Sequence, residues 1–316
     1  MLRGLRPAPP FRARKNSIVR ILLTGASGFV GGHFRAHLPT SPLAGPGGER
    51  IDLRDEPAVR AAVEAARPEA VVHLAALSHV PESIDNPREA ITVNVVGTLN
   101  LLSALQDCGF RGRMVFVGSA EAYGAVSPEE LPIVEERPLR PRNPYAASKA
   151  AAEALAYQWS QTAEFDIVLA RPFNHIGPGQ QPRFVVSDFA RQITEIKLGR
   201  RPPVLRVGEL EPTRDFTDVR DTVRAYALLL EHGANGEVYN VCSGEERSAG
   251  DLLGRLMEQG GIEAEVEAEE ARKRPGEPRR FVGSFAKLQR DTGWRPEIPL
   301  GTSLGDILRD WEGRLR

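Results

Sequence analysis

The feature that most constrains the fold is a glycine-rich turn between an apolar run and a helix-like stretch. Residues 18–23 read IVRILL, which is typical of a strand buried on both faces of a parallel sheet. TGASGFVG follows at once and places Gly25, Gly28 and Gly31 in the spacing GxxGxxG. Glycines so spaced permit a tight turn, a close backbone approach to a pyrophosphate, and close packing of helix on strand. The turn therefore predicts an anion site at a helix N-terminus.

Strand-like and helix-like stretches alternate beyond this turn. Further strands are expected at 70–76, 113–119, 166–172 and 237–242, with helical patterns between them. This alternation predicts an α/β fold with a Rossmann-type, doubly wound parallel sheet. Proline and glycine become frequent after Arg171, which indicates a smaller, partly interleaved α/β substrate lobe. The expected parts are a disordered basic arm at 1–17, a dinucleotide-binding domain at 18–172 plus about 213–242, and a substrate lobe at about 173–212 plus 243–316.

Net charge, apolar runs and cysteine content limit which partners and which cellular compartment we expect for this chain. A net charge of -1 gives no global attraction for nucleic acid or an anionic membrane, and no apolar run has spanning length. Cys108 and Cys242 are the two cysteines, so there is no disulfide framework, and we expect a cytoplasmic protein with reduced thiols. His33 and His37 have helical i,i+4 spacing but lack a third ligand, so no metal site is expected.

Three segments are expected to bind a dinucleotide: the glycine turn, residues 52–53 and residues 74–76. Asp52 is at the distance from the turn that suits ribose recognition, although it can also contact the adenine. Arg35 is a candidate for a 2′-phosphate, so NADPH and NADH both stay open. The candidate cofactor-binding residues are Gly25, Ser27, Gly28, Phe29, Val30, Gly31, Asp52, Leu53, Leu74, Ala75 and Ala76.

The candidate catalytic residues are Ser119, Tyr145 and Lys149. YAASK opens a helical stretch, and its i,i+4 spacing places Tyr145 and Lys149 on one helix face. A neighbouring ammonium favours the phenolate, so the tyrosine is expected to exchange a proton near neutral pH. Ser119 ends the strand RMVFVGS, at the carboxyl edge of the sheet, where its hydroxyl can bond the same oxygen.

TGASGFVG, HLAALSHV, GSAEAYG and PYAASK, in this order, resemble the extended short-chain dehydrogenase/reductase family. The resemblance covers nearly the whole chain from Ile18 onward. It implies a nicotinamide cofactor, NADPH or NADH, contacted also by Tyr145 and Lys149. It further implies a nucleoside-diphosphate-sugar substrate and a homodimer formed through the helices around 90–107 and 145–160.

RPFNHIGPGQ, VGELEPTRDFTDVRD and RPGE resemble the GDP-sugar branch of that family. The resemblance implies that Asn174 and Arg214 hold the diphosphate, that Arg274 adds a positive contact, and that Glu277 accepts from guanine. Arginine forks suit phosphate oxygens, and a carboxylate suits the guanine N–H edge. Four further residues are candidates for the sugar site because they follow a strand or the GPGQQPR loop: Ser78, His79, Phe184 and Val185.

The branch contains 4-keto reductases and 4,6-dehydratases, and GSAEAYG bears on the choice. The dehydratases would read Thr, then Ser or Asp, then Glu, where this chain has Ser119, Ala120 and Glu121. Ala120 cannot donate a proton, which favours reduction of the C4 ketone of GDP-4-keto-6-deoxy-D-mannose to a GDP-6-deoxyhexose, GDP-D-rhamnose if the resemblance extends to stereochemistry. Glu121 occupies the position of a dehydratase base, so a GDP-mannose 4,6-dehydratase stays an alternative. A redox-neutral epimerase and a non-catalytic nicotinamide sensor also stay open.

Overall fold

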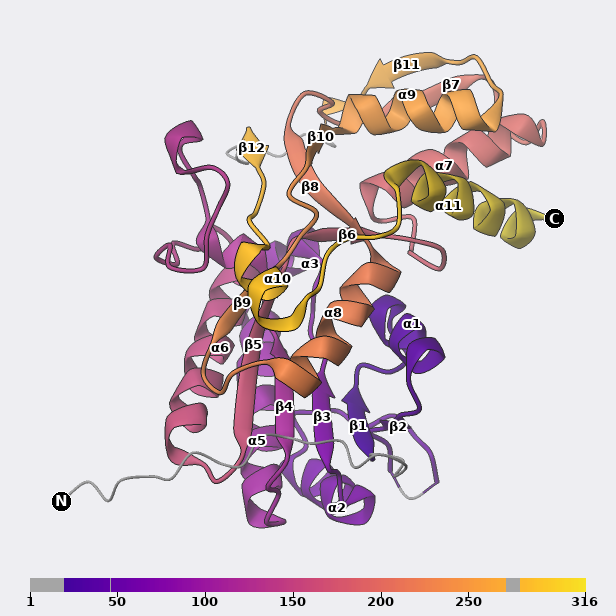
Figure 1. The fold of residues 1–316 in the computed structure, drawn as a ribbon. Coiled ribbons are helices and arrows are strands. Elements are labelled where there is room, and N and C mark those ends of the chain that lie inside the picture. Colours follow the sequence, from indigo (N-terminus) through magenta and orange to yellow (C-terminus); the bar gives the residue numbers. More distant parts are fainter. Residues whose placement is uncertain (1–19, 46, 271–278) are drawn as a thin grey trace.

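The computed structural model describes residues 20–45, 47–270 and 279–316. Its centre is a six-stranded parallel sheet in the order β2-β1-β3-β4-β5-β9 (Figure 1). The strands are β1 (Ile21–Thr24), β2 (Ser41–Pro42), β3 (Ala70–His73), β4 (Arg113–Val117), β5 (Asp166–Pro172) and β9 (Val238–Val241). Strands β2 and β3 lie on opposite sides of β1, so the strand order reverses at β1. A topological switch point therefore lies between the carboxyl ends of β1 and β3.

Apolar rows on both faces explain why these strands are buried. Side chains of residues that are paired in register across the central strands project from the same face of the sheet. Side chains of neighbours along one strand project from opposite faces. One row packs against the first helical layer and comprises Leu23, Val72, Val115 and Val168. The other row packs against the second layer and comprises Leu22, Val71, Met114 and Ile167.

Two helical layers cover the sheet (Figure 1). The first consists of α1 (Phe29–His37), α8 (Val219–His232) and α10 (Ala286–Thr292). The second consists of α2 (Glu56–Ala66), α5 (Gly97–Asp107) and α6 (Pro144–Thr162). The predicted doubly wound parallel sheet is therefore present, and its second strand, in the loop-like stretch 40–50, is short.

The helical pattern around 88–105 is not one continuous helix. It consists of α4 (Pro87–Ile91), a π-helical turn η1 (Thr92–Val96), and α5, and the short helix α3 (Val80–Asp85) precedes it. The π turn carries Asn94, whose side chain is buried and bonds the backbone N–H and C=O of Leu77 and the hydroxyl of Ser148. The irregular turn thus ties the loop after β3 to helix α6.

The second lobe lies above the carboxyl edge of the sheet. It contains β6 (Asn174–Ile176), β8 (Thr213–Asp218), β10 (Glu246–Ser248) and β12 (Arg280–Phe281) in one small sheet, and β7 (Val204–Val207) paired with β11 (Glu265–Ala268) in another. Helices α7 (Val185–Lys197), α9 (Ala249–Gly260) and α11 (Leu300–Leu315) enclose its core. Two 3-10 turns, η2 (Ala120–Tyr123) and η3 (Pro128–Glu130), complete the described elements.

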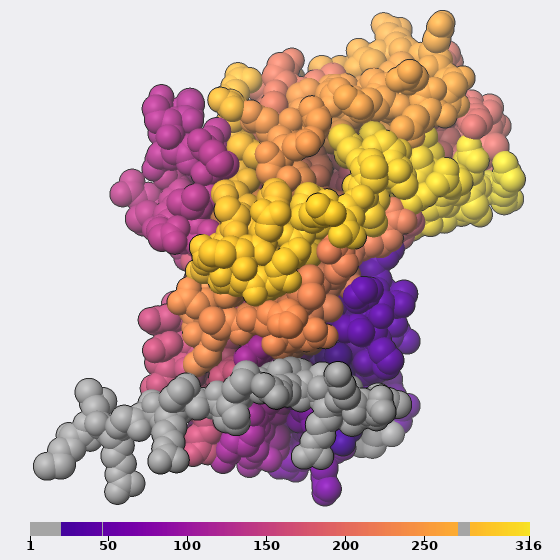
Figure 2. All heavy atoms as spheres, viewed as in Figure 1, coloured from indigo at the N-terminus to yellow at the C-terminus, as the bar shows by residue number. Residues whose placement is uncertain are grey.

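The two parts are interleaved along the chain. Strand β9 returns to the large sheet after β6, α7 and β8 have entered the lobe. Figure 2 shows the yellow C-terminal residues lying across the junction between the two parts. The expected arm at 1–17 lies outside the described residues, and the exact domain boundaries stay predictions. No helix in the described part of the chain has both the length and the apolar character needed to cross a membrane.

Candidate active site

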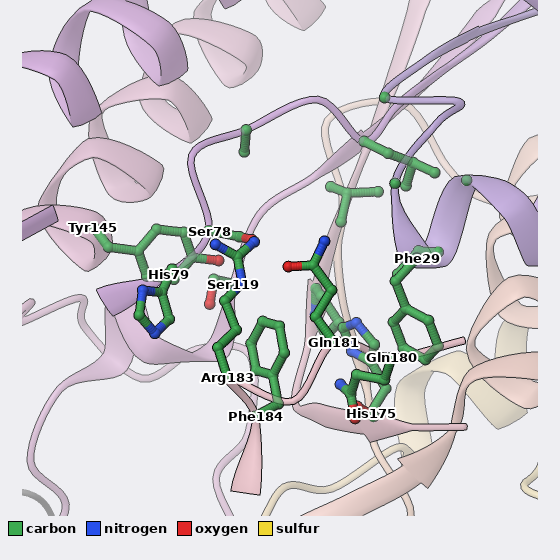
Figure 3. Close-up of a pocket in the computed structure, with 18 of the residues that line it drawn as sticks. Phe29, Ser78, His79, Ser119, Tyr145, His175, Gln180, Gln181, Arg183 and Phe184 are labelled. Carbon is green, nitrogen blue, oxygen red and sulfur yellow. The ribbon is translucent and has the colours of Figure 1, made fainter. Parts of the chain in front are cut away.

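A cleft of about 2600 Å³ separates the carboxyl edge of the large sheet from the second lobe. Small-molecule pockets measure roughly 300–1,000 Å³, so this cleft has room for two large ligands. Every described residue assigned to the site from sequence lines this one cleft. Arg274 and Glu277 lie outside the described residues. Figure 3 shows the part of the cleft between Phe29 and Tyr145.

The glycine turn forms a cradle that side chains would fill. Gly25 has φ +70°, in the left-handed region, and a Cβ there would lie 2.7 Å from the backbone nitrogen of Ala75. A Cβ on Gly31 would lie 2.2 Å from the carbonyl oxygen of Gly25. Gly28 precedes helix α1, has no side-chain cap hydrogen bond, and lines the cleft together with Ser27, Phe29 and Val30. The cradle fits a dinucleotide pyrophosphate.

A buried hydrogen-bond chain, not anticipated from the sequence, supports the cradle. The Ala75 N–H donates to Thr24 Oγ1, which contacts His73 Nδ1 at 2.7 Å. His73 Nε2 contacts Thr98 Oγ1 at 3.0 Å, and that hydroxyl donates to the Asn94 carbonyl oxygen. The order of donors assigns His73 as the neutral Nε2–H tautomer. Burial, with the nearby Lys149 charge, lowers its pKa to about 3, which keeps the ring neutral.

The far end of the cleft is where the adenosine is expected. Asp52 binds the Arg54 guanidinium, which lowers the pKa of its carboxyl group, and Arg54 also pairs with Glu89. Leu53 is buried beneath Gly97, whereas Arg35 is exposed at the edge of the cleft. Asp52 therefore enters the cleft as one member of a charged pair.

Ser119, Tyr145 and Lys149 meet where β4 and the start of α6 come together. The Ser119 hydroxyl accepts from the Glu121 N–H and caps the turn η2, which fixes its orientation. It also hydrogen-bonds the Tyr145 side chain. Helix α6 begins just before Tyr145, with Asn143 as its cap, and the Lys149 ammonium donates to the Val117 carbonyl oxygen. The three predicted residues are thus brought together.

The protonation of this trio differs from the expectation of a tyrosine that titrates near neutral pH. Burial raises the pKa of Tyr145 to about 12, outweighing the Ser119 hydrogen bond that favours the phenolate. Burial lowers the pKa of Lys149 to about 8, and the Glu153 carboxylate opposes that shift. Tyr145 is therefore a protonated phenol at neutral pH, suited to donate a proton rather than to accept one.

A buried ion pair lies one helical turn beyond Lys149. Glu153 binds Arg171, with both side chains 7% exposed, and Arg171 also donates to the Glu135 carbonyl oxygen. The Arg171 guanidinium lies over the Tyr123 ring, 4.8 Å from its centroid. The pair fixes α6 to the end of β5 and holds a negative charge near the Lys149 ammonium.

The proposed substrate contacts come from both sides of the cleft. Asn174 opens β6 and is paired in register with Phe216 of β8, the strand that carries Arg214. From the other side, the His79 ring meets the Phe184 ring edge to face, with centroids 6.2 Å apart. Ser78 lines the cleft, and Val185 opens helix α7.

Position 121 is also in the cleft. The Glu121 carboxylate accepts from the Asn143 side chain at 3.4 Å, and its charge opposes ionisation of Tyr145. Ala120 beside it is buried and offers only a methyl group. In the described residues no group of three or more His, Cys, Asp or Glu side chains has the arrangement of a metal site.

The sequence reasoning assigned Phe184 of the loop 177–184 to the site but missed Arg183 and the contacts that hold the start of the loop. His33 of α1 contacts the Pro178 carbonyl oxygen at 2.7 Å, and the Phe29 ring stacks on His175 with centroids 6.1 Å apart. Arg183, near the other end of the loop, lines the cleft beside Phe184 (Figure 3). The motif GPGQQPR was the available signal, but it did not indicate which side chains turn inward.

Comparison with known proteins decides the family. A family model described as GDP-mannose 4,6 dehydratase matches residues 49–306. The chain belongs to this family of extended short-chain dehydrogenases/reductases. It is 45% identical over 302 residues to GDP-6-deoxy-D-mannose reductase of Pseudomonas aeruginosa, covering 94% of this chain and 98% of that protein.

Solved structures of the family have the same fold. A structure of RMD from Pseudomonas aeruginosa complexed with NADPH matches with a TM-score of 0.88 and 44% identity, covering 94% of this chain and 99% of that one. UDP-glucose 4-epimerase of Thermus thermophilus, in complex with NAD, matches with a TM-score of 0.82 and 31% identity, covering 93% of this chain and 99% of that one. The predicted Rossmann-type fold and membership of the extended family are thereby confirmed.

Proposed function

We propose that the protein reduces the C4 ketone of GDP-4-keto-6-deoxy-D-mannose with NADPH or NADH, giving a GDP-6-deoxyhexose, GDP-D-rhamnose. The observation that carries the proposal is that Ser119, Tyr145 and Lys149 line the same cleft as a glycine cradle that fits a dinucleotide. A 45% identical relative, which this chain matches over nearly its full length, is GDP-6-deoxy-D-mannose reductase.

A bound reduced nicotinamide supplies the hydride for such a reduction. Tyr145 then donates its proton to the C4 oxygen, which becomes strongly basic as the carbonyl is reduced. Ser119 donates a hydrogen bond to the same oxygen and orients it, because its own hydroxyl is fixed by the Glu121 N–H. In the proposed reaction the Lys149 ammonium, which donates to the Val117 carbonyl oxygen in this structure, turns to the phenolate as it forms. Glu153 helps to keep that lysine charged.

The residues around Tyr145 support reduction over dehydration. Elimination of water from C5 and C6 requires an acid to protonate the departing hydroxyl group. The methyl group of Ala120 stands at the position where the related dehydratases carry a polar side chain, and it is buried. Glu121 is a candidate base, but the neighbouring position lacks the acid that dehydration would need. The contact of Glu121 with Asn143 suits a role in binding substrate hydroxyl groups.

The cofactor and substrate contacts complete the proposal. NADPH is the first cofactor to test, because the structure from Pseudomonas aeruginosa is complexed with it. We assign the dinucleotide to the cradle, to Asp52 and Leu53, and to the loop Leu74–Ala76. The GDP-sugar is assigned to Ser78, His79, Asn174, Phe184, Val185 and Arg214, with Arg274 and Glu277 as further predicted contacts.

The proposal also includes a cytoplasmic homodimer. Cys108 and Cys242 are free thiols, which suits a reducing compartment. Helices α4 and α6 and the turn η1 carry large exposed apolar side chains, which include Ile91, Val96 and Tyr157 at 42%, 40% and 51% exposure. Helix α5 adds Leu99 at 39%. Apolar side chains gathered on packed helices are typical of a subunit interface.

The test is an assay with GDP-4-keto-6-deoxy-D-mannose and either NADPH or NADH, which follows the loss of reduced-nicotinamide absorbance. The proposal predicts cofactor consumption equal to the amount of sugar reduced. A parallel reaction contains GDP-mannose without added cofactor. Conversion of GDP-mannose to the 4-keto sugar, with no consumption of NADPH or NADH in the first reaction, would make the protein a dehydratase and Glu121 its base.

A further inference from the structure

The loop 177–184 crosses the cleft from the cofactor cradle to the catalytic tyrosine. At one end Phe29 and His33, from the first turns of α1, contact His175 and Pro178. At the other end the Phe184 ring packs against His79. Arg183 therefore lies on a segment that both the dinucleotide side and the substrate side hold in place.

Arg183 reaches across to the helix that adjoins Tyr145. Its guanidinium contacts the carboxylate of Glu82 in α3 at 3.4 Å, and the hydroxyl of the next residue, Ser83, accepts a hydrogen bond from the Tyr145 N–H at 3.1 Å. Figure 3 shows the Arg183 side chain extending from the loop toward Ser78, Ser119 and the Tyr145 hydroxyl. The positive group thus lines the same cleft as the hydroxyl groups of Ser119 and Tyr145.

The contact with Glu82 leaves this guanidinium available to a ligand. The distance is long, and the side chains of Arg183 and Glu82 are 40% and 48% exposed. Exposed ion pairs of this kind contribute little to stability. The Phe184 ring, 5.5 Å from the guanidinium carbon, limits its movement, so its planar set of donors is already oriented toward the cleft.

We propose that Arg183 binds the hexose ring of the substrate, exchanging its contact with Glu82 for hydrogen bonds to the C2 and C3 hydroxyl groups. This inference rests on the proposed function. In the proposed reaction Tyr145 and Ser119 contact the C4 oxygen of the hexose. The ring carbons next to C4 then lie in the part of the cleft that Arg183 also lines. The diphosphate is assigned to Asn174 and Arg214, on β6 and β8 of the second lobe. Arg183 is thus a specificity residue for the sugar and not for the nucleotide.

The test compares the binding of GDP and of GDP-mannose, which carries the same C2 and C3 hydroxyl groups, by titration calorimetry with NADP present. Arg183→Met removes the charge and keeps an unbranched apolar stem. It is expected to weaken GDP-mannose binding about tenfold, since hydrogen bonds from charged groups contribute at roughly that level, and to leave GDP binding within about twofold. Arg183→Lys keeps the charge but lacks the planar donors, and is expected to recover only part of the loss.

Two control variants separate this role from general effects. Glu82→Gln removes the competing carboxylate and is expected to leave GDP-mannose binding equal or tighter. Arg255→Met removes a positive charge that pairs with an acidic residue on α9, away from the cleft, and is expected to change neither affinity. Each variant is checked for an unchanged thermal unfolding temperature.

The outcomes are distinct. Equal weakening of GDP and GDP-mannose by Arg183→Met would place the residue on the diphosphate and overturn the inference, as would no change in either affinity. Wild-type protein that binds neither GDP nor GDP-mannose would instead contradict the proposed function itself.

Discussion

At the scale of single residues, the environment of Tyr145 decides which way it moves a proton. Its phenol stays protonated because burial raises its pKa to about 12. The sequence motif YAASK indicated the residue and its helix, but not this shift, because the burial comes from segments distant in sequence. The Lys149 ammonium, which the motif suggested as the dominant influence, instead donates to the Val117 carbonyl oxygen.

Tyr145→Phe removes the proposed proton donor while keeping the ring. We expect kcat to fall by about 10²- to 10⁴-fold, the usual contribution of a general acid. The affinity for NADPH is expected to change little, because the glycine cradle is untouched. Steady-state kinetics and equilibrium binding measure the two quantities separately, and full turnover in this variant would refute the assignment.

Glu153→Gln leaves the Arg171 guanidinium buried without its carboxylate. Breaking a buried pair in this way is expected to lower the free energy of unfolding by about 3–5 kcal/mol. The pKa of Lys149 is expected to fall, since Glu153 raises it. Urea unfolding and the pH profile of kcat measure these effects.

The matched control for this variant is Glu56→Gln on α2, which breaks an ion pair whose two side chains are 53% and 40% exposed. It is expected to destabilise the protein far less, because solvent screens an exposed pair. Equal destabilisation by the two substitutions would show that burial of the Glu153–Arg171 pair does not matter.

At the scale of elements, the sequence predicted the pieces with strong local signals. The strands of the large sheet and helices such as Glu56–Ala66 follow from apolar periodicity. The small strands of the second lobe were not anticipated, because their pairing partners are far away in sequence, as with Asn174 and Phe216. Helix α7 was missed although Val186, Phe189, Ala190 and Ile193 repeat at helical spacing, a local signal that the sequence does carry. The π turn at Thr92–Val96 was missed because its cause is the tertiary bonding of Asn94, not a local preference.

The junction of β1 and α1 gives a direct test of the cradle. Gly31→Ala would place a Cβ 2.2 Å from the Gly25 carbonyl oxygen, so the turn must move. We expect at least about a tenfold loss in NADPH affinity, since a displaced turn loses the amide contacts to the pyrophosphate. Gly32→Ala, the next position on the same helix, meets no atom within 4 Å and is expected to bind normally. Equal NADPH affinity in the two variants, measured by titration calorimetry, would contradict this account.

The hydrogen-bond chain through His73, which supports the glycine cradle, makes the free energy of unfolding depend on pH. The folded pKa of about 3 lies below the ordinary value of 6.5, so the unfolded chain takes up the proton first. The contribution to stability is complete above pH 6.5 and is lost as the pH falls toward 3, with about 2 kcal/mol lost by pH 5. Urea unfolding at pH 7 and pH 5 measures the slope. His73→Gln cannot titrate and should lack this part of it, so an unchanged slope would contradict the assignment.

At the scale of the whole molecule, one cleft brings together residues from both parts of the chain. The glycine turn, the loop after β3 and the catalytic residues come from the large sheet, and Asn174 and Arg214 come from the lobe above it. Sequence motifs identified nearly all of these positions because each motif is short and local. They did not reveal Arg183, whose place in the cleft depends on how the loop 177–184 crosses from α1 to α3.

The proposed dimer is tested at this scale. Leu99→Glu places a charge on the exposed face of α5, and we expect it to shift the protein from dimer to monomer, because an unpaired charge is costly to bury in an interface. Light scattering coupled to size exclusion measures the mass. Val266→Glu, at an exposed apolar site on β11 in the second lobe, is the control and is expected to stay dimeric. A monomeric wild-type protein would contradict the proposal.

The most direct measurement follows the hydride itself. The protein is incubated with GDP-4-keto-6-deoxy-D-mannose and NADPH that carries deuterium at the transferable position of the nicotinamide, and the product is examined by NMR. The proposed function predicts a GDP-6-deoxyhexose with deuterium at C4, in an amount equal to the NADPH oxidised. In a parallel reaction with unlabelled NADPH, the H3–H4 and H4–H5 coupling constants of the product identify GDP-D-rhamnose. A product without deuterium at C4, or unchanged substrate with NADPH intact, would contradict it.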